Sequence, residues 1–340
     1  MDCPRCLSSM LLIAVATCSG LRAEDSDAAL DPIREAIAKA IPLLEQGSQG
    51  SAEQRTCFTC HNQALPILAL AAAKRHGFSV DADNLQHQVR HTVEHLIRGR
   101  EGYLEGRGQG GQVITAGYAL WALEASGFQP DETTDAVTHY LLEFQKDSDR
   151  WSHPGQRPPS SGSDFTTTYV ALRGLGTFGS DEQQAAIDER TETVGGWLLS
   201  NAPADTEDRV FRLRALVNLS AGERAVDEAV DELLSSQRDD GGWAQTAGRD
   251  SDAYATGTVL AALIQTGCLP RDAPAVTRGV QHLLDTQLED GSWHVVSRAE
   301  PFQTYFESGF PHGTDQFISI AASSWAVVAL LEALPKVESP

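Results

Sequence analysis

The most distinctive group of reactive side chains in this 340-residue sequence is Cys57-Phe58-Thr59-Cys60-His61. Two thiols separated by two residues and followed by an imidazole form the attachment pattern of c-type haem. In that chemistry both thiols add to the vinyl groups of haem, and the histidine becomes an axial ligand of the iron. The motif therefore predicts a haem c site at Cys57, Cys60 and His61, and a haem would in turn require a redox partner.

The same three side chains allow two other interpretations. Cys57 and Cys60 could form a disulfide that braces a loop, because redox and structural pairs share the C-x-x-C spacing. Alternatively, both thiolates and His61 could bind zinc, which would need a fourth ligand that the sequence does not identify. The sequence also leaves the sixth ligand of a haem iron undefined, so haem, zinc and disulfide all stay open.

A second group of candidate residues lies at the starts of apolar helical stretches. The matching copies are Ser163-Asp164-x3-Thr168, Ser251-Asp252-x3-Thr256 and, more loosely, Asp315-x3-Ser319. An Asp or Ser just before a helix is the preferred N-cap, worth roughly 1 kcal/mol, and an acid there also complements the helix dipole. We therefore expect Asp164 and Asp252 to cap helices, which is compatible with a ligand-binding role for Asp164.

A long connection precedes the last apolar stretch and is rich in aromatic and titratable side chains. Its candidate ligand-binding residues are Tyr305, Glu307, Phe310, His312 and Asp315. Connections this long inside a compact array tend to be lids or binding segments. We expect this segment either to cover a ligand site or to plug one end of the helical array.

Two alternating sets of helices must position these residues. Six stretches rich in Ala, Leu and Thr are mostly apolar: 61–76, 112–126, 165–178, 207–221, 252–266 and 316–334. Six others have a regular polar face: 27–46, 83–98, 131–146, 181–200, 224–237 and 272–287. Because only the second set is amphipathic, we expect it outside and the apolar set inside. The pattern predicts an all-α fold, a closed (α/α)6 toroid of helix-pair repeats.

A repeated motif accompanies this alternation. Leu-Leu-Ser-Ser-Gln-Arg-Asp-Asp-Gly-Gly-Trp around residue 237 recurs near residue 287 as Leu-Leu-Asp-Thr-Gln-Leu-Glu-Asp-Gly-Ser-Trp, and a third copy near residue 145 has lost its glycines. The paired positions are Gln145/Trp151, Gln237/Trp243 and Gln287/Trp293. This Gln…Gly-x-Trp repeat resembles that of the squalene/hopene (terpene) cyclase and protein prenyltransferase superfamily. We expect its Gln and Trp residues to lock outer helices together.

The resemblance also implies a candidate catalytic acid. Hopene-type cyclases protonate an alkene with an Asp-x-Asp-Asp motif, in which burial and neighbouring carboxylates raise the pKa of the acidic Asp. The matching stretch here is Asp250-Ser251-Asp252-Ala253, with Asp252 at the proton-donor position and Ala253 in place of the last Asp. The catalytic candidates are thus Asp252 and Asp250, within an incomplete motif. Cyclases of this type also use two barrels, whereas this chain has residues for one.

The expected topology brings the candidates together. If the inner helices run parallel, their starts meet at one rim of the barrel, below the 294–315 connection. The residues that would share this rim are Cys57, Cys60, His61, Asp164, Asp252 and Asp315.

Residues 1–23 have the features of a secretory signal peptide, with Arg5 near the start and small residues before Glu24. The apolar run is too short for a transmembrane anchor, and Thr17 before Cys18 departs from a lipoprotein signal. We expect a secreted or periplasmic protein with a single toroid domain at 24–340. A formal net charge of −21 argues against nucleic-acid and anionic-membrane partners.

Together, these features predict a protein that binds an apolar, isoprenoid-like small molecule at the barrel mouth, beside a haem c or metal site. One alternative is a protonation-initiated terpenoid cyclase that uses Asp252. Another is a non-catalytic scaffold with a Cys57–Cys60 disulfide or a zinc site. The sequence does not decide whether the chain is an enzyme.

Overall fold

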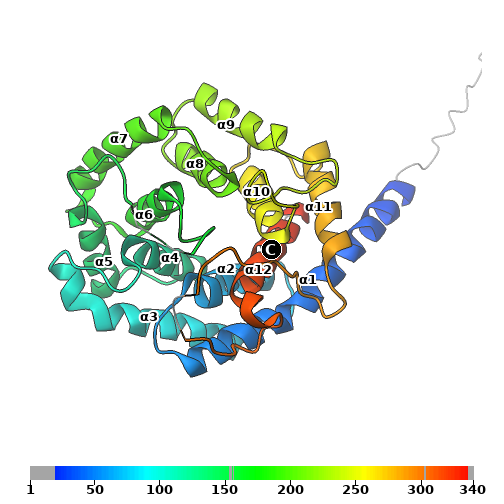
Figure 1. Cartoon of the computed structure of the whole chain (residues 1–340), viewed down its shortest axis with the longest axis horizontal. Helices are drawn as coiled ribbons and strands as arrows, with labels where there is room; N and C mark the ends of the chain where they lie inside the picture. Colours follow the sequence, from blue (N-terminus) through cyan, green and yellow to red (C-terminus); the bar gives the residue numbers. More distant parts are fainter. Residues whose placement is uncertain (1–19, 153–154, 156, 302–303, 336–340) are drawn as a thin grey trace, which may run out of the picture.

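The helices of this chain form two concentric rings (Figure 1). The computed structural model describes residues 20–152, 155, 157–301 and 304–335, and these contain twelve α-helices, one π-helical turn and one 3-10 turn. The predicted signal peptide lies mostly outside this part of the chain, because residues 1–19 are not among those described. Within it, an isolated bridge between Arg157 and Ser161 is the only β-type pairing.

The inner ring holds the apolar helices and the outer ring the amphipathic ones. The inner elements are η1 (Cys60–Ala64) with α2 (Leu65–Arg75), α4 (Gln112–Ala125), α6 (Asp164–Phe178), α8 (Thr206–Asn218), α10 (Ala253–Gln265), and η2 (Gly313–Asp315) with α12 (Gln316–Ala333). The outer elements are α1 (Gly20–Gln54), α3 (Ala82–Leu104), α5 (Glu132–Glu143), α7 (Gln184–Ser200), α9 (Glu223–Ser235) and α11 (Pro274–Thr286). The predicted (α/α)6 toroid is confirmed.

The burial pattern explains why the two sets separate. In α10 every residue from Ala253 to Leu263 is buried, so the helix has no face for solvent. In α9 the buried residues are Ala229, Val230 and Leu233, which lie on one side of the helix. The chain therefore buries the most apolar surface when helices such as α10 are inside and helices such as α9 are outside. The segment Gly313–Ala333 is apolar enough to cross a membrane, but it is mostly buried here as the last inner helix.

The ring closes where the last inner helix meets the first. Helix α12 packs against α2 on one side and α10 on the other. The approach of α10 is so close that a Cβ added to Gly257 would lie 2.7 Å from the carbonyl carbon of Trp325. Glycine at this position therefore lets the two helices touch through their backbones.

The repeat tryptophans bond to the outer helix before them, and two of the three repeat glutamines join one outer helix to the next, as expected from the sequence. Each repeat tryptophan donates from Nε1 to a leucine carbonyl ten residues earlier, at 2.8 Å: Trp151 to Leu141, Trp243 to Leu233 and Trp293 to Leu283. Gln237 Nε2 donates to Ala275 O in the first turn of α11, also at 2.8 Å. Gln287 Nε2 donates to Ala36 O of α1 at 2.8 Å. The last repeat therefore ties the end of the ring to its first helix.

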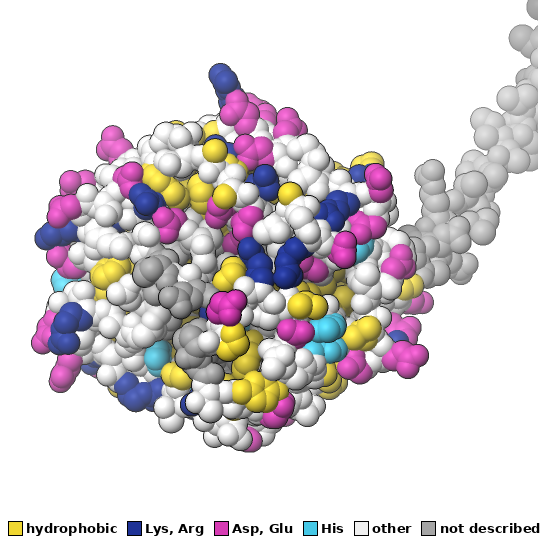
Figure 2. Space-filling view, viewed as in Figure 1, with side chains coloured by type: hydrophobic (Ala, Val, Ile, Leu, Met, Phe, Trp, Pro, Cys, Tyr) yellow, Lys and Arg dark blue, Asp and Glu magenta, His cyan; other side chains and the backbone are white. Residues whose placement is uncertain are grey.

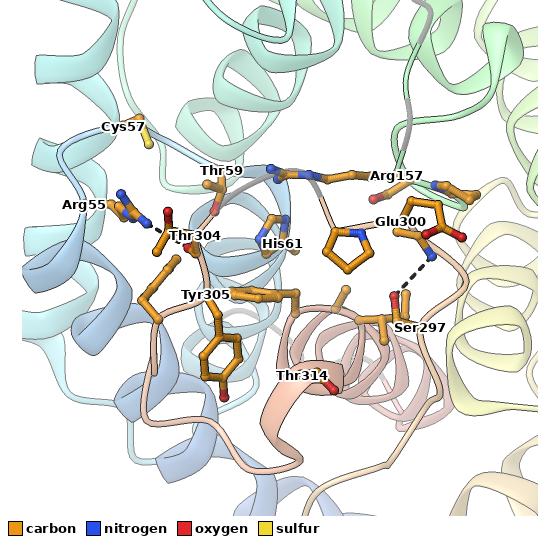
Figure 3. Close-up of a pocket in the computed structure, with 18 residues that line it drawn as sticks. Arg55, Cys57, Thr59, His61, Arg157, Ser297, Glu300, Thr304, Tyr305 and Thr314 are labelled. Carbon is orange, nitrogen blue, oxygen red and sulfur yellow. Dashed lines mark hydrogen bonds between the residues drawn. The ribbon is translucent and has the colours of Figure 1, made fainter.

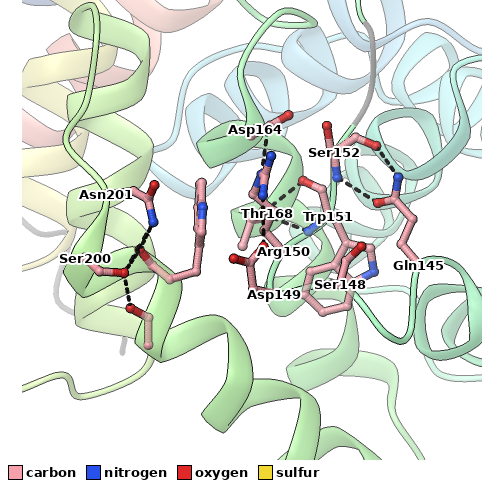
Figure 4. Close-up of polar contacts among 12 residues, drawn as sticks. Gln145, Ser148, Asp149, Arg150, Trp151, Ser152, Asp164, Thr168, Ser200 and Asn201 are labelled. Carbon is pink, nitrogen blue, oxygen red and sulfur yellow. Dashed lines mark hydrogen bonds and ion pairs between the residues drawn. The ribbon is translucent and has the colours of Figure 1, made fainter.

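The third copy, which lacks glycines, uses a different link (Figure 4). Gln145 bonds back to its own loop, since its Nε2 donates to Ser152 O at 3.0 Å and its Oε1 accepts from Ser152 N at 2.8 Å. The link to the next outer helix comes from Arg190 of α7. Its Nη2 donates to Arg150 O at 3.1 Å, and its guanidinium lies 4.2 Å from the centroid of the Trp151 ring. An arginine thus takes over the bridging role of glutamine.

Candidate functional site

A pocket of about 200 Å³ lies at the mouth of the ring, where the inner helices begin. Four segments line it: the C-x-x-C-H region, the loop around 157–160, the connection after residue 294, and the start of α12 (Figure 3). Figure 2 shows the molecule from the same side as Figure 1, with acidic side chains spread around its outer edge. The four segments that line the pocket are far apart in the sequence and meet at the mouth.

The C-x-x-C-H segment enters the ring through a capped π-helical turn. Thr59 is the N-cap of η1, and its Oγ1 accepts from Asn62 N at 3.2 Å. The N–H and O–H groups of Thr59 both donate to Gln63 Oε1, at 2.9 and 2.8 Å. These bonds fix the turn that carries Cys60 and His61. Turns of this type are rare and frequently mark functional sites.

His61 forms the buried floor of the pocket. The residue is 7% exposed, and burial lowers the pKa of His61 to about 3, with a smaller contribution from Arg157. The imidazole is therefore neutral at physiological pH and keeps a lone pair for a metal or a hydrogen-bond donor. The ring of Phe317 meets it edge-on, with 5.4 Å between ring centroids.

The two cysteines differ in their surroundings. Cys57 is exposed and lines the pocket, whereas the Cys60 sulfur lies 4.0 Å from Ser160 Oγ. Burial raises the pKa of the Cys60 thiol, which favours its protonated form. Both cysteines are free thiols in this structure, so the disulfide alternative is not formed. In the described part of the chain, no group of three or more His, Cys, Asp or Glu side chains is arranged to hold a metal ion.

The donor set is compatible with a covalently attached haem. Two free thiols and a neutral imidazole are present, and Cys57 and His61 line the pocket together with Arg55 and Arg157. The pocket volume of about 200 Å³ is below the roughly 300–1,000 Å³ typical of cofactor and ligand sites. A haem-bearing form would therefore require a wider pocket.

The 294–315 connection forms one wall of the pocket and is held down by specific contacts. Arg55 Nη2 donates to Thr304 O at 3.0 Å, and its guanidinium lies 4.9 Å from the centroid of Phe306. Gln316 Nε2 donates to Phe306 O and to Tyr305 Oη, both at 3.0 Å. This part of the connection covers the mouth, as a lid would.

The other predicted residues of the connection do not line the pocket. Phe310 is 2% exposed and packs into the core, so here the connection acts as a plug. Glu307 accepts a hydrogen bond from Tyr305 at the surface. His312 stacks on His294, with ring centroids 4.6 Å apart. Of the predicted ligand-binding residues, Tyr305 is the one that lines the pocket.

Asp252 is the N-cap of α10, as predicted. Its Oδ1 accepts from Ala255 N at 3.0 Å, and its Oδ2 accepts from Gln245 Nε2 at 3.1 Å. Burial raises the pKa of Asp252, but its side chain is not among those that line the mouth pocket. Asp250 is exposed to solvent. The two carboxylates of the candidate catalytic motif therefore do not meet at the pocket.

The predicted capping role of Asp164 is wrong, because Ser163 is the cap. Ser163 Oγ accepts from Thr166 N at 3.1 Å. Asp164 is the first residue of α6 and pairs with Arg150, whose Nε lies 2.7 Å from Oδ2 (Figure 4). An acid in the first turn still complements the helix dipole. Its side chain does not line the mouth pocket.

A chain of contacts places Asp252 and Asp315 at the same rim as the pocket. Ser297 lines the pocket, and its N–H donates to Asp315 Oδ1 at 2.9 Å. The next residue, Arg298, donates from Nε to Gln245 Oε1 at 2.9 Å, and Gln245 holds Asp252. The inner helices α10 and α12 therefore begin at the end of the ring where His61 lies. The shared rim is present, although only part of it faces the pocket.

Sequence reasoning missed two features, namely two arginines of the pocket and a buried glutamate that is not part of the pocket lining. Arg55 and Arg157 line the pocket, but nothing in their local sequence separates them from surface arginines. Glu207 is buried in the first turn of α8, where its Oε1 accepts from Thr166 Oγ1 at 2.9 Å and from Tyr254 Oη at 3.4 Å. Burial raises the pKa of Glu207 to about 8. The sequence feature that could have indicated this buried residue is a glutamate at the start of an inner helix.

Residues 165–339 match the family described as the squalene-hopene cyclase C-terminal domain. A squalene–hopene cyclase of Zymomonas mobilis is 30% identical over 120 residues, which are 35% of this chain and 18% of that protein. One from Bradyrhizobium diazoefficiens is 34% identical over 115 residues, or 28% of this chain and 16% of that protein. The similarity thus spans less than a fifth of either relative.

Solved structures with the same ring have low sequence identity. The type II terpene cyclase MstE from Scytonema has a TM-score of 0.56 at 15% identity, covering 89% of this chain and 98% of that one. A glycosidase variant in complex with glucose also has a TM-score of 0.56, at 11% identity, with 88% and 98% covered. Because two different chemistries occur on equally similar rings, this likeness establishes the fold alone.

Proposed function

This chain belongs to the squalene-hopene cyclase C-terminal domain family, and we propose that it binds an apolar, isoprenoid-like molecule at the barrel mouth, beside a c-type haem attached to Cys57 and Cys60. The observation that carries the proposal is the mouth pocket, whose lining combines His61 with the 294–315 connection. The proposal includes export to a secreted or periplasmic location, since residues 1–23 read as a signal peptide.

The pocket lining favours an apolar occupant. Phe306, Phe317, Ile318 and Ala321 contribute apolar side chains on the α12 side, and Pro158 does so from the facing loop. Burial of hydrocarbon stabilises a complex by about 0.8 kcal/mol per CH2 group. The lining also includes polar side chains, among them Arg55, Arg157 and Glu300, which could orient one polar end of such a molecule.

The fold is able to hold a molecule of this class. MstE has been solved in complex with geranylgeranyl dihydroxybenzoate, on a ring with a TM-score of 0.55 and 14% identity to this chain. That ligand belongs to MstE. For the present chain, the shared ring supports an isoprenoid-like ligand as a class.

Three residues would hold the haem. Cys57 and Cys60 would form its thioether bonds, and His61 would provide an axial nitrogen, with its turn fixed by Thr59. When bound, haem supplies a one-electron redox centre, which would require a redox partner.

Two other readings have less support. Cyclisation initiated by Asp252 needs a proton donor that reaches the substrate, yet both Asp252 oxygens accept hydrogen bonds and neither lines the pocket. A scaffold without a ligand predicts a barrel mouth filled by side chains, whereas a pocket is present.

The haem part is tested by expressing the full chain in a host that exports proteins and attaches c-type haem. The expected result is a Soret band and an intact mass raised by one haem over the signal-cleaved polypeptide. The double variant Cys57→Ser/Cys60→Ser should show neither. A wild-type protein without a Soret band and without the added mass overturns the haem assignment.

The ligand part is tested separately, by calorimetric titration of the same protein with farnesol. Binding to the wild-type protein and to Cys57→Ser/Cys60→Ser is expected, because the apolar wall is formed mainly by α12 and the 294–315 connection. Failure of farnesol to bind either protein overturns the ligand assignment and leaves the haem result unaffected.

A further inference from the structure

A second cavity, of about 630 Å³, lies at the opposite end of the ring, where the inner helices end. All six inner helices contribute to its lining, which includes the aromatic residues Trp121 and Trp325 and the cations Arg75, Arg173 and Arg214. Its volume falls within the roughly 300–1,000 Å³ of small-molecule sites. This cavity is separate from the mouth pocket, with which it shares no lining residue.

Arg214 is the unusual member of this lining. It is 4% exposed, and its guanidinium carbon lies 5.8 and 5.5 Å from the ring centroids of Trp121 and Trp325. Its Nη1 donates to Gln265 Oε1 at 3.0 Å. Among the described residues, no acceptor meets hydrogen-bond geometry with its Nε and Nη2 atoms, although the Tyr169 phenol lies close enough to interact with the guanidinium. A buried donor without an acceptor destabilises the folded state, and more so when it is charged.

The neighbouring Arg173 shows what completes such a group. Its Nε and Nη2 donate to the two carboxylate oxygens of Glu124, at 2.6 and 2.8 Å, and its Nη1 donates to Tyr169 Oη at 2.9 Å. Arg173 uses its Nε and Nη2 atoms for this bidentate pair. The same two atoms lack an acceptor in Arg214. Glu332, the other carboxylate of the cavity, accepts from Gln265 instead, at 3.0 Å. Arg214 thus presents the same two donors with which Arg173 holds a carboxylate, and no carboxylate of the described residues pairs with them.

The preference of helix C-termini for cations does not explain why a buried arginine occurs at position 214. Helix C-termini favour cations, and Arg75 serves this purpose by donating to Ala125 O at the end of α4, at 3.1 Å. Arg214 instead lies in the third turn of α8 and bonds a side-chain amide. Burial lowers the pKa of Arg214, and the Tyr169 phenol offsets part of this effect. A bound anion would offset it further.

We propose that this cavity binds a small organic anion, whose carboxylate or phosphate oxygens accept from Nε and Nη2 of Arg214. The apolar body of the ligand would lie along Leu68, Val217 and Val328. The cavity lining holds three arginines and two glutamates, which suits a monoanion. Both nitrogens are shielded from water here, so anion binding requires a local shift of the side chains that cover them.

The test uses the full chain and three probes: octanoate, its neutral analogue octanol, and inorganic phosphate. We expect octanoate to bind at least tenfold more tightly than octanol in calorimetric titrations, with a change in tryptophan fluorescence. Arg214→Met should weaken octanoate binding at least tenfold, and Arg214→Lys should weaken it because lysine lacks the planar fork. Phosphate binding that is lost in both variants would identify the oxyanion alone as the recognised group.

The control is Arg212→Gln, which changes a buried arginine on the same helix that does not line the cavity. Arg212 Nε donates to Leu198 O at 3.1 Å, so its loss should reduce stability while octanoate affinity is kept. Phe317→Ala at the mouth should also keep octanoate affinity. The proposal is overturned if octanol binds as tightly as octanoate, or if Arg214→Met and Arg214→Lys bind octanoate as tightly as the wild type.

Discussion

His61 of the first inner helix and Phe317 of the last lie edge to face, with ring centroids 5.4 Å apart. Helix α12, which carries Phe317, packs against α2, so this contact lies where the ring closes. Closure therefore places the imidazole of the C-x-x-C-H motif and an aromatic wall in one pocket, although the two residues are far apart in the sequence.

Phe317→Ala should weaken farnesol binding by about 1–2 kcal/mol, or about five- to thirtyfold, because the ligand loses a large apolar contact. The effect on thermal stability should be small, since Phe317 is only half-buried. Titration calorimetry and a melting curve measure the two effects. The matched control is Phe78→Ala, a half-buried phenylalanine that lies outside the pocket. An equal loss of affinity in both variants would contradict the assignment of the mouth.

The ring could be predicted because its signals are periodic and local. The alternation of apolar and amphipathic helices and the repeated Gln and Trp residues each recur several times, so a single deviation does not hide them. The cap at Asp252 is equally local. The cap of α6 shows the limit of such reasoning. Ser163 and Asp164 are adjacent and both suit an N-cap, so the choice between them depends on the backbone.

The pocket was less predictable because its walls depend on distant contacts. Arg55 donates to Thr304, 249 positions away in the chain, and the sequence around Arg55 has no feature that indicates this. The rim was predicted from helix direction, but helix direction does not say which rim residues face the cavity. Asp252 turns to Gln245, whereas Phe317 turns to His61.

Glu207→Gln should remove a pH dependence of stability. The folded-state pKa of Glu207 is about 8, against an ordinary value of 4.5, so the folded protein keeps a proton that the unfolded chain releases. The contribution of this group to the free energy of unfolding is therefore fully present below pH 4.5 and is lost as the pH rises towards 8. Between pH 5 and pH 8, the free energy of unfolding of the variant should therefore increase by up to about 4 kcal/mol relative to that of the wild type.

Urea unfolding of both proteins between pH 5 and 8 measures this effect. The difference between the two proteins isolates Glu207, because other titrating groups, such as His61, contribute equally to both. A stability difference that does not change with pH would show that Glu207 is ionised in the folded state.

Substitution of Asp252 separates capping from proton donation. Asp252→Asn should leave stability nearly unchanged, since Asn is as good an N-cap as Asp, whereas Asp252→Ala should cost about 1 kcal/mol. Farnesol affinity should be unchanged in both variants, because the side chain does not line the pocket. Chemical denaturation and calorimetry report these quantities. Conversion of a linear isoprenoid by the wild type that disappears in Asp252→Asn would instead establish the cyclase alternative.

Gln287→Ala should loosen the closure of the outer ring. Gln287 Nε2 donates to Ala36 O of α1 and to Gly291 O, so its removal leaves two carbonyls without this donor and should cost about 1–3 kcal/mol. Because one of these bonds ties α11 to α1, hydrogen exchange should rise in residues 30–54 of α1. Gln145→Ala is the control, since its amide bonds to Ser152 in its own loop. Equal exchange of α1 in the two variants would show that the glutamine link does not hold the ring closed.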